Sequence, residues 1–155
     1  MSLVEKSVRI EAPIEGVFAY ASDWRHWAEW FEGVSDLRPT TARVRGNGAR
    51  FRYRAKAFGL AANVETEIRN FAENRGWTGV SLRGLSHTTR WSFSSSNGST
   101  LFTYRLEYRM PIPLIGSMIH ALAMKKEWTR IVDRSLRNLK ATLERLPTSG
   151  SRALD

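Results

Sequence analysis

The C-terminal third of the chain carries one long helical stripe, and it follows a series of strand-like segments. Apolar residues recur every three or four positions up to Leu146, which predicts a helix over about 114–146. The segments before it alternate apolar and polar residues, as half-buried strands do. A sheet with one apolar face must bury that face. We therefore expect an α+β fold in which a curved antiparallel sheet wraps around the long C-terminal helix.

The segments before this helix have recognisable boundaries. Pro13 suits the first position of a short helix after the first strand. Asp23 is a good N-cap for a second helix, and Gly33 is a plausible end for it. Strands are predicted at 3–11, 34–44 with an irregularity at Pro39, 49–58, 60–71, 76–83, 87–95 and 100–110. About seven strands and two short helices therefore precede the long helix.

Two consecutive strands carry complementary charges on one face. Basic residues occupy alternate positions from Arg50 to Lys56, and acidic residues occupy alternate positions at Glu65 and Glu67. Consecutive strands joined by a short turn pair antiparallel. We expect these bases and acids to lie across from one another, where such pairs stabilise a sheet modestly.

Length and composition limit the classes of protein that remain. The chain has 155 residues and no cysteine, which excludes disulfides, thiolate metal sites and a cysteine nucleophile. We expect one domain over 1–147 and a frayed tail over 148–155. No signal-peptide pattern and no apolar run of membrane-spanning length occurs. These features are consistent with a cytoplasmic protein.

The charge is strongly positive. Net charge is +9, from 24 Lys and Arg against 15 Asp and Glu. A basic surface can attract nucleic acid or an anionic membrane, or it can be an ordinary solvated surface. The arginines are spread along the chain without a block of like charge. This distribution favours the solvated surface, and nucleic acid is not the favoured partner.

The order and spacing of these segments resemble a known family. The first strand, the Ala-Pro that opens a helix, and Asp23 followed by spaced tryptophans occur together in "VEKSVRIEAPIEGVFAYASDWRHWAEWFEGV". With "GNGARFRYRAKAFG", "GSTLFTYRLEY" and "LRNLKATLERL", the chain resembles the START-like superfamily (SRPBCC). That superfamily includes the Bet v 1-like allergens and the polyketide cyclase/dehydrase and lipid-transport proteins. The resemblance covers about residues 3–146 and implies a helix-grip fold of seven antiparallel strands with an apolar cavity beside the long helix.

The stretch "SDWRHWAEWFEGV", Ser22 to Val34, has three interpretations. Asp23, His26 and Glu29 are residue types that can bind a metal ion. A row of carboxylates and a histidine on a helix surface is more often solvated. We therefore predict no metal and no cofactor. Base stacking requires exposed aromatic residues in a basic groove. The helical stripe instead favours packing in the core, with Trp27 or Trp30 at the mouth of a pocket.

The inward strand faces supply the predicted ligand-binding wall. A wall of mostly apolar residues with a few polar groups suits a small molecule or lipid, and a filled core is the alternative. The placement of Trp77 is the least fixed, because Gly76 and Gly79 permit a bulge. The candidate ligand-binding residues are Trp27, Trp30, Phe51, Tyr53, Val64, Ile68, Trp77, His87, Trp91, Phe102, Tyr104, Tyr108, Met118, His120 and Leu122.

His87 and His120 are the candidate acid–base residues, with His87 preferred. A general base needs a pKa near neutral and reach to the proton it takes. The resemblance implies aldol chemistry in its aromatase/cyclase branch, where His87 would act with Tyr53 or Tyr104. The alternative is that His87 only orients a ligand. Binding without catalysis is favoured, because no catalytic pair of that branch can be matched residue by residue.

The segment "MPIPLIGSMIHALAMKK", Met110 to Lys126, is apolar around nearly the whole helix circumference. One interpretation is core packing with a contact between two copies of the chain. The other is a gate hinged at Gly116, or an edge that contacts an anionic membrane, with Lys125 and Lys126 near the headgroups. An interaction module that works through the basic sheet face or in a quinone pathway is a third functional class.

Overall fold

A seven-stranded antiparallel sheet curls around one long helix in the computed structural model, which describes residues 2–57, 60–109 and 117–145. The elements, in chain order, are β1 (Ser2–Ile10), α1 (Ile14–Ala21), α2 (Trp24–Trp30), β2 (Val34–Pro39), β3 (Arg50–Ala57), β4 (Leu60–Ala72), β5 (Gly76–Arg83), β6 (His87–Ser96), β7 (Ser99–Tyr108) and α3 (Ser117–Arg145). The predicted fold class is confirmed. The boundary of the tail at 148–155 lies outside the described residues.

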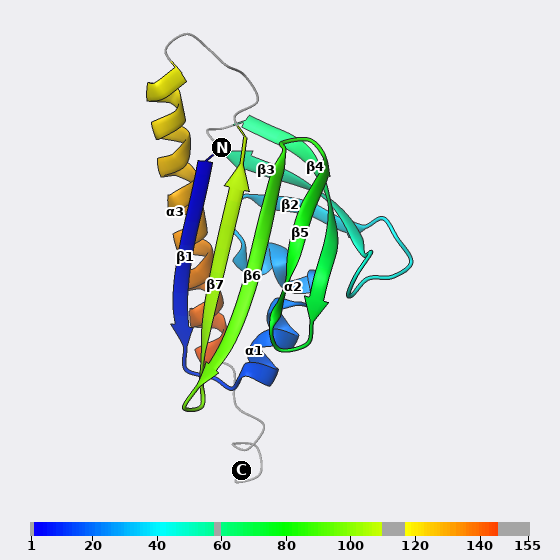
Figure 1. The fold of residues 1–155 in the computed structure, drawn as a ribbon, viewed down its shortest axis with the longest axis vertical. Coiled ribbons are helices and arrows are strands. Elements are labelled where there is room, and N and C mark those ends of the chain that lie inside the picture. Colours follow the sequence, from blue (N-terminus) through cyan, green and yellow to red (C-terminus); the bar gives the residue numbers. More distant parts are fainter. Residues whose placement is uncertain (1, 58–59, 110–116, 146–155) are drawn as a thin grey trace.

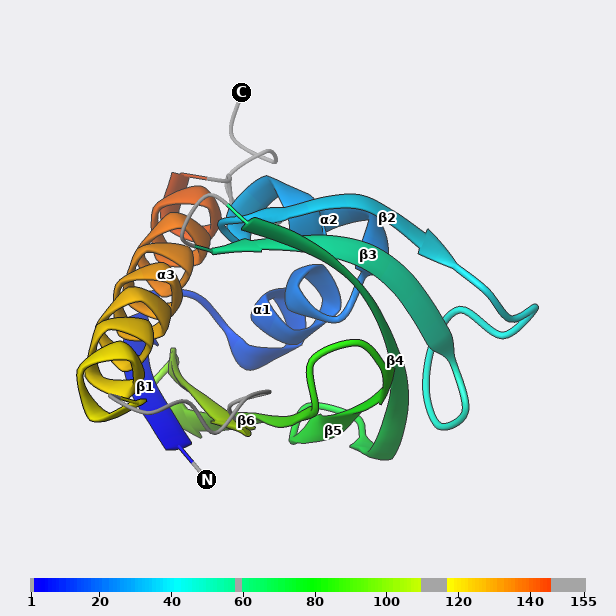
Figure 2. The ribbon, with the colours of Figure 1, turned by 90° about the horizontal axis from the view of Figure 1, so that it is seen from above.

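The sheet has the order β1-β7-β6-β5-β4-β3-β2. From β2 to β7 each strand pairs with the next along the chain, and β1 pairs with β7, the last strand. Figure 2 shows the sheet curling from β1 to β2, with α3 across its open side. Figure 1 shows α1 at one end of the molecule and the start of α3 at the other.

Helix α3 is held against β1 by an apolar stripe and two polar contacts. Ile131, Val132, Leu136, Leu139 and Leu143 are buried at helical spacing. Lys140 Nζ donates to the carbonyl oxygen of Arg9 at 2.6 Å, and Glu144 accepts from the backbone N–H of Glu11 at 2.8 Å. These contacts fix one edge of the sheet to the helix that covers it.

The predicted charge pairs between two strands are confirmed. In the register of β3 and β4, Arg50 lies opposite Glu67 and Arg52 lies opposite Glu65. The nitrogen–oxygen distances are 2.7 and 3.4 Å. The outer face of these strands is therefore partly neutralised, which reduces the basic field expected from the sequence.

Two predicted boundaries are wrong. Helix α2 ends at Trp30 rather than at Gly33, because the Phe31 backbone is already extended. Gly33 instead begins the pairing with β3: its carbonyl accepts from Lys56 N at 2.8 Å, and a Cβ at Gly33 would lie 2.7 Å from Lys56 O. Its φ of 81° also favours glycine.

Strand β2 is shorter than the predicted 34–44 and ends at Pro39. Its irregularity lies between Ser35 and Arg38, where Asp36 has a φ of 53°. Pro39 itself keeps its pairing with Phe51. Proline is accommodated there because β2 is the edge strand of the sheet and its N–H side needs no partner.

Candidate functional site

A cavity of about 890 Å³ lies between the inner face of the sheet, α2 and α3. Its wall is mostly apolar and contains several small residues. Ala55 on β3, Ala62 on β4 and Gly79 on β5 leave space where larger side chains would project. Gly79 has little freedom to change, since a Cβ there would lie 2.6 Å from Thr89 Oγ1. This pocket lies where the sequence predicts a ligand-binding cavity, and its use as a binding site stays a prediction.

Three tryptophans form its inner wall. The Trp77 and Trp91 rings are 4.5 Å apart with planes inclined by 27°, and Trp27 lies 5.9 Å from Trp91. Trp27 Nε1 donates to Ala21 O at 2.7 Å, and Trp91 Nε1 donates to Thr89 Oγ1 at 3.1 Å. Because the N–H groups of Trp27 and Trp91 already have partners, these two indoles offer an apolar surface to the cavity.

The exposed residues of the wall mark the mouth of the cavity. Lys56, Ala61, Ser86 and Arg109 belong to it. The backbone N–H of Arg109, just after β7, donates to Ser86 O in the β5–β6 turn at 3.1 Å. Figure 1 shows this turn and the end of β7 at the same end of the molecule as the start of α3. Two of these exposed wall residues, Lys56 and Arg109, are cationic.

The polar part of the wall centres on His87 at the start of β6. His87 Nδ1 lies 2.7 Å from Leu85 O, and its backbone N–H donates to Ser81 Oγ at 2.9 Å. His87 Nε2 lies 3.5 Å from the Tyr53 hydroxyl on β3. The inward alternation of β3 and β6 brings these two side chains together across the cavity.

Burial keeps these groups neutral. It lowers the pKa of His87 below 6.5, an effect that the hydrogen bond to Leu85 opposes. Burial also raises the pKa of the Tyr53 hydroxyl above its usual value. The pKa of Tyr104 is raised by burial first and by the nearby Tyr53 second. At neutral pH His87, Tyr53 and Tyr104 are therefore uncharged.

One family of known proteins matches the chain over nearly its whole length. The family model described as "Polyketide cyclase / dehydrase and lipid transport" matches residues 1–144. The chain belongs to this family. No curated protein matches it in sequence.

Solved structures share the fold of this family member. A crystal structure from Thermus thermophilus has a TM-score of 0.79 at 22% identity and covers 92% of this chain and 97% of its own. A START superfamily protein from Mycobacterium smegmatis has a TM-score of 0.76 at 19% identity, covering 94% and 99%. The Zhui aromatase/cyclase from Streptomyces sp. R1128 has a TM-score of 0.76 at 14% identity, covering 96% and 97%. At these identities, the similarity establishes the fold alone.

Eight predicted ligand-binding residues of this family member lie together in the cavity wall. They are Trp27, Tyr53, Val64, Ile68, Trp77, His87, Trp91 and Tyr104. Trp77 is buried and faces inward. The β4–β5 pairing is irregular just before it, between Arg69 and the Ala72–Gly76 pair, which agrees with the bulge that Gly76 and Gly79 were expected to permit. Trp27 lies at the inner wall, against Trp77 and Trp91, rather than at the mouth. Direct contact of these residues with a ligand stays a prediction.

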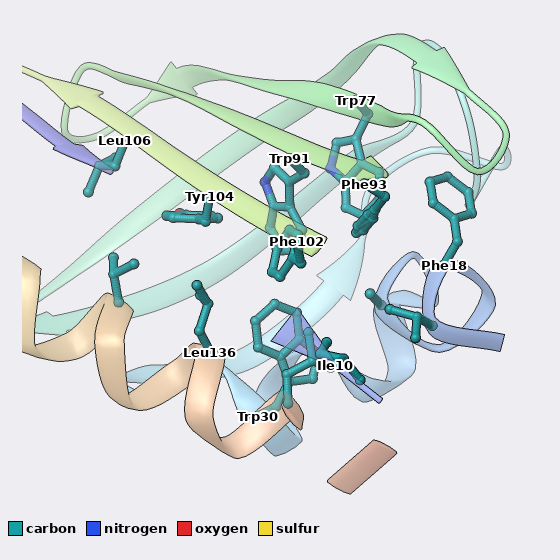
Figure 3. Packing of buried hydrophobic residues seen from close by; sticks show 14 of the residues in the cluster. Ile10, Phe18, Trp30, Trp77, Trp91, Phe93, Phe102, Tyr104, Leu106 and Leu136 are labelled. Carbon is teal, nitrogen blue, oxygen red and sulfur yellow. The ribbon is translucent and has the colours of Figure 1, made fainter. Parts of the chain in front are cut away.

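Four other predicted residues lie outside the wall, in solid core. Trp30 is 1% exposed and packs edge-on against Trp91 and Phe102, at 5.5 and 6.3 Å (Figure 3). Phe51, Phe102 and Tyr108 are equally buried. They face inward as predicted, but α2 and α3 fill the space in front of them.

On α3 the predicted face is wrong. Met118 and Leu122 are 78% and 63% exposed, and His120 is exposed as well. Met124 and Trp128 line the cavity instead. Because this part of the helix is apolar nearly all round, periodicity could not select the face. The predicted gate at Gly116 lies outside the described residues.

Several wall residues were missed. Phe31, Val34 and Leu37 reach the cavity from the chain around β2, and Leu85 reaches it from the β5–β6 turn. Leu37 lies at the irregularity of β2 and Leu85 lies in a turn, where neither helical nor strand periodicity applies. The signal available was their apolar character in segments otherwise rich in turn residues.

The row of Asp23, His26 and Glu29 lies on the surface of α2. His26 Nδ1 lies 3.0 Å from Glu29 Oε2, and the Tyr20 hydroxyl donates to the same oxygen at 2.8 Å. Asp23 caps the helix, as predicted, by accepting from Arg25 N at 3.0 Å. Among residues 2–57, 60–109 and 117–145, no group of three such side chains could hold a metal ion.

Proposed function

We propose that this protein binds an apolar small molecule or a lipid in the cavity between the sheet and α3. The observation that carries the proposal is a cavity of about 890 Å³ with a predominantly apolar wall. Small-molecule sites have volumes of roughly 300–1,000 Å³, and burial of apolar surface contributes about 25 cal/mol per Å². The family description and the START superfamily neighbour support the same class of ligand.

A fluorescence titration tests this function. Trp27, Trp77 and Trp91 line the cavity, so a bound ligand should change the indole emission. Fatty acids, sterols, quinones and polycyclic phenols would be added in turn to the purified protein. We expect saturable one-to-one binding by at least one class. An unchanged emission with every class, together with no heat of binding in calorimetry, would contradict the proposal.

A second candidate is a cyclase or dehydratase reaction on a bound poly-β-keto chain. The proximity of His87 Nε2 and the Tyr53 hydroxyl favours it, as does the aromatase/cyclase among the structural neighbours. Unprotonated Nε2 would take the proton from a carbon between two carbonyls. The Tyr53 hydroxyl would donate to the oxygen that becomes the enolate.

The two candidates differ in the fate of the bound compound. The compound class found by titration would be incubated with the protein and analysed by mass spectrometry for cyclised or dehydrated product. His87→Ala should abolish product formation and leave binding within about 10-fold. Unchanged product formation in this variant would exclude His87 as the acid–base residue, and absence of product in the wild type would leave binding as the function.

An anionic membrane surface is a proposed partner. Met118, Ile119 and Leu122 at the start of α3 are 78%, 77% and 63% exposed, and the exposed Lys125 and Lys126 follow one turn later. With a helical repeat of 3.6 residues, these five side chains share one face. Apolar residues beside lysines suit insertion between anionic headgroups. No helix within the described ranges meets the length and hydropathy required to cross a bilayer.

Vesicle co-sedimentation tests this contact. The wild type should bind phosphatidylserine vesicles and bind neutral phosphatidylcholine vesicles less. Leu122→Asp should lose this binding, while Leu82→Asp, which also changes an exposed leucine, should keep it. Equal binding by both variants would contradict the proposal. A dimer that Leu122→Asp dissociates in lipid-free ultracentrifugation would assign the same face to a second copy of the chain.

A further inference from the structure

The tautomer of His87 is set by its surroundings. A carbonyl oxygen only accepts hydrogen bonds, so the 2.7 Å contact with Leu85 O requires the proton on Nδ1. In a neutral ring Nε2 is then a bare acceptor. Because burial lowers the pKa of His87, the ring is neutral at physiological pH. The cavity wall therefore holds a fixed lone pair at Nε2.

The Tyr53 hydroxyl is the nearest group to that lone pair. The oxygen–nitrogen distance of 3.5 Å is longer than an ordinary O–H···N hydrogen bond. No other hydrogen bond to Tyr53 Oη or His87 Nε2 is formed within the described part of the chain. Burial raises the pKa of Tyr53, so its hydroxyl keeps its proton. One acceptor and one donor thus lie side by side, weakly joined to each other.

Two of the indole N–H groups of the wall are already engaged. Trp27 Nε1 is paired with Ala21 O, and Trp91 Nε1 is paired with Thr89 Oγ1. Trp77 Nε1 and Trp128 Nε1 form no hydrogen bond within the described part of the chain, but an indole N–H only donates. The ring nitrogen of the wall that can accept from a ligand O–H is therefore His87 Nε2. The rest of the ligand would lie against indole and aliphatic surface.

We propose that His87 and Tyr53 select a ligand with a hydroxyl group on an apolar skeleton, whose O–H donates to His87 Nε2 and whose oxygen accepts from the Tyr53 hydroxyl. This inference rests on the proposed binding function and names the ligand class. A single hydroxyl oxygen satisfies both wall groups. An ether oxygen cannot donate to Nε2. A carboxylate would place its charge against the Nε2 lone pair, and an unpaired buried charge is costly.

Four pyrene probes separate these contributions: pyrene, 1-hydroxypyrene, 1-methoxypyrene and 1-pyrenecarboxylate. Each absorbs where tryptophan emits, so energy transfer from the wall tryptophans reports binding to the full chain. We expect 1-hydroxypyrene to bind about 10-fold more tightly than 1-methoxypyrene, in line with a hydrogen bond that the ether lacks. The carboxylate should bind more weakly than the hydroxyl compound.

Two variants locate the effect. In His87→Asn the amide nitrogen can still donate to Leu85 O, but the acceptor at Nε2 is lost. The preference for hydroxyl over methoxy should then fall to about 1. Tyr53→Phe removes a donor that either oxygen can use, so it should weaken both probes by a similar factor of about 3 to 10. Circular dichroism of each variant would establish that it folds.

The outcomes distinguish this inference from the proposed function. Failure of all four probes to bind the wild type would contradict the cavity function and the inference together. Equal affinities of pyrene, 1-hydroxypyrene and 1-methoxypyrene would overturn the inference and leave the cavity function standing. A preference for the hydroxyl that persists in His87→Asn would also overturn it. The wild-type comparison decides the matter even if a variant does not fold.

Discussion

Ser135 in the middle of α3 accepts a hydrogen bond from the backbone N–H of Glu32, 103 residues earlier in the chain, at 2.9 Å. The same hydroxyl donates to Ile131 O at 2.7 Å. Arg130 and Arg134 on α3 pair with the Glu32 carboxylate. This junction holds the segment between α2 and β2 against the helix. Phe31, Glu32 and Gly33 in that segment line the cavity, so the junction positions part of the wall.

Ser135→Ala should destabilise the protein. Ser135 is fully buried, and its loss leaves the Glu32 N–H without an acceptor, which costs about 1–3 kcal/mol. Urea unfolding would measure the free energy of unfolding. Ser94→Ala, on the exposed outer face of β6, is the matched control and should change it by less than about 0.5 kcal/mol. Equal effects of the two substitutions would show that the junction contributes nothing.

Gly76→Ala should be among the most damaging substitutions in the sheet. A Cβ at this position would lie 1.8 Å from Trp91 O, and the φ of 141° is unfavourable for other residues. We expect a loss of roughly 3 kcal/mol in thermal or urea unfolding. In contrast, Gly16→Ala in α1 meets open space and should stabilise the protein by about 0.5–1 kcal/mol. A Gly76→Ala protein with wild-type stability would contradict this account of the β5 start.

His87 should make folding stability depend on pH. Its pKa in the folded state is lowered below 6.5 by burial, so the unfolded chain binds the proton more readily. Stability is therefore fully present above about pH 6.5 and decreases as pH falls toward the folded-state pKa. The Tyr53 hydroxyl lies beside His87 Nε2, and burial raises the pKa of Tyr53 and of Tyr104, so both phenols stay neutral in this range.

The measurement compares wild type with His87→Asn at about pH 8 and about pH 5. The wild type should lose more stability over this interval than the variant, because the other titrating groups are common to both. Equal losses of stability in the two proteins would show that His87 takes up a proton as readily in the folded state as in the unfolded chain. That result would also remove the basis for a fixed acceptor at Nε2.

Ala55→Phe should block ligand binding without unfolding the protein. Ala55 faces the cavity from β3, where an added ring has room to enter the open space. We expect the affinity for any cavity ligand to fall at least about 10-fold, since the ring occupies part of the site. Ala28→Phe, on the exposed side of α2, is the control and should bind normally. Normal binding by both variants would place the ligand elsewhere.

The sequence predicted which face of the sheet a residue lies on better than it predicted whether that residue lines the cavity or the solid core. Alternation in β3 and β4 placed Tyr53 and Val64 inward and brought Arg50 opposite Glu67, and the structure agrees. Phe51 and Phe102 face inward by the same rule, yet they lie in solid core. A period of two specifies the side of the sheet. It does not specify which part of that side is covered by a helix.

The remaining wrong predictions concern residues whose position depends on helix orientation or on tertiary contacts. Periodicity could not predict which face of α3 lines the cavity, because the start of the helix is apolar nearly all round. Met124 and Trp128 line the cavity, whereas Met118 and Leu122 are exposed. Leu37 and Leu85 lie in irregular segments whose path depends on tertiary contacts. His87 could be selected from sequence, since it begins an alternating strand. Its tautomer could not, because the partner carbonyl of Leu85 is set by the turn.

The stacked indoles of the inner wall have an optical consequence. Trp77 and Trp91, with rings 4.5 Å apart and inclined by 27°, are close enough to share their electronic excitation. Such a pair behaves as one chiral chromophore, and its signal depends on the separation and tilt of the two rings. A molecule that enters the cavity and presses on either ring changes that signal. The unlabelled protein should therefore report its own occupancy through its circular dichroism.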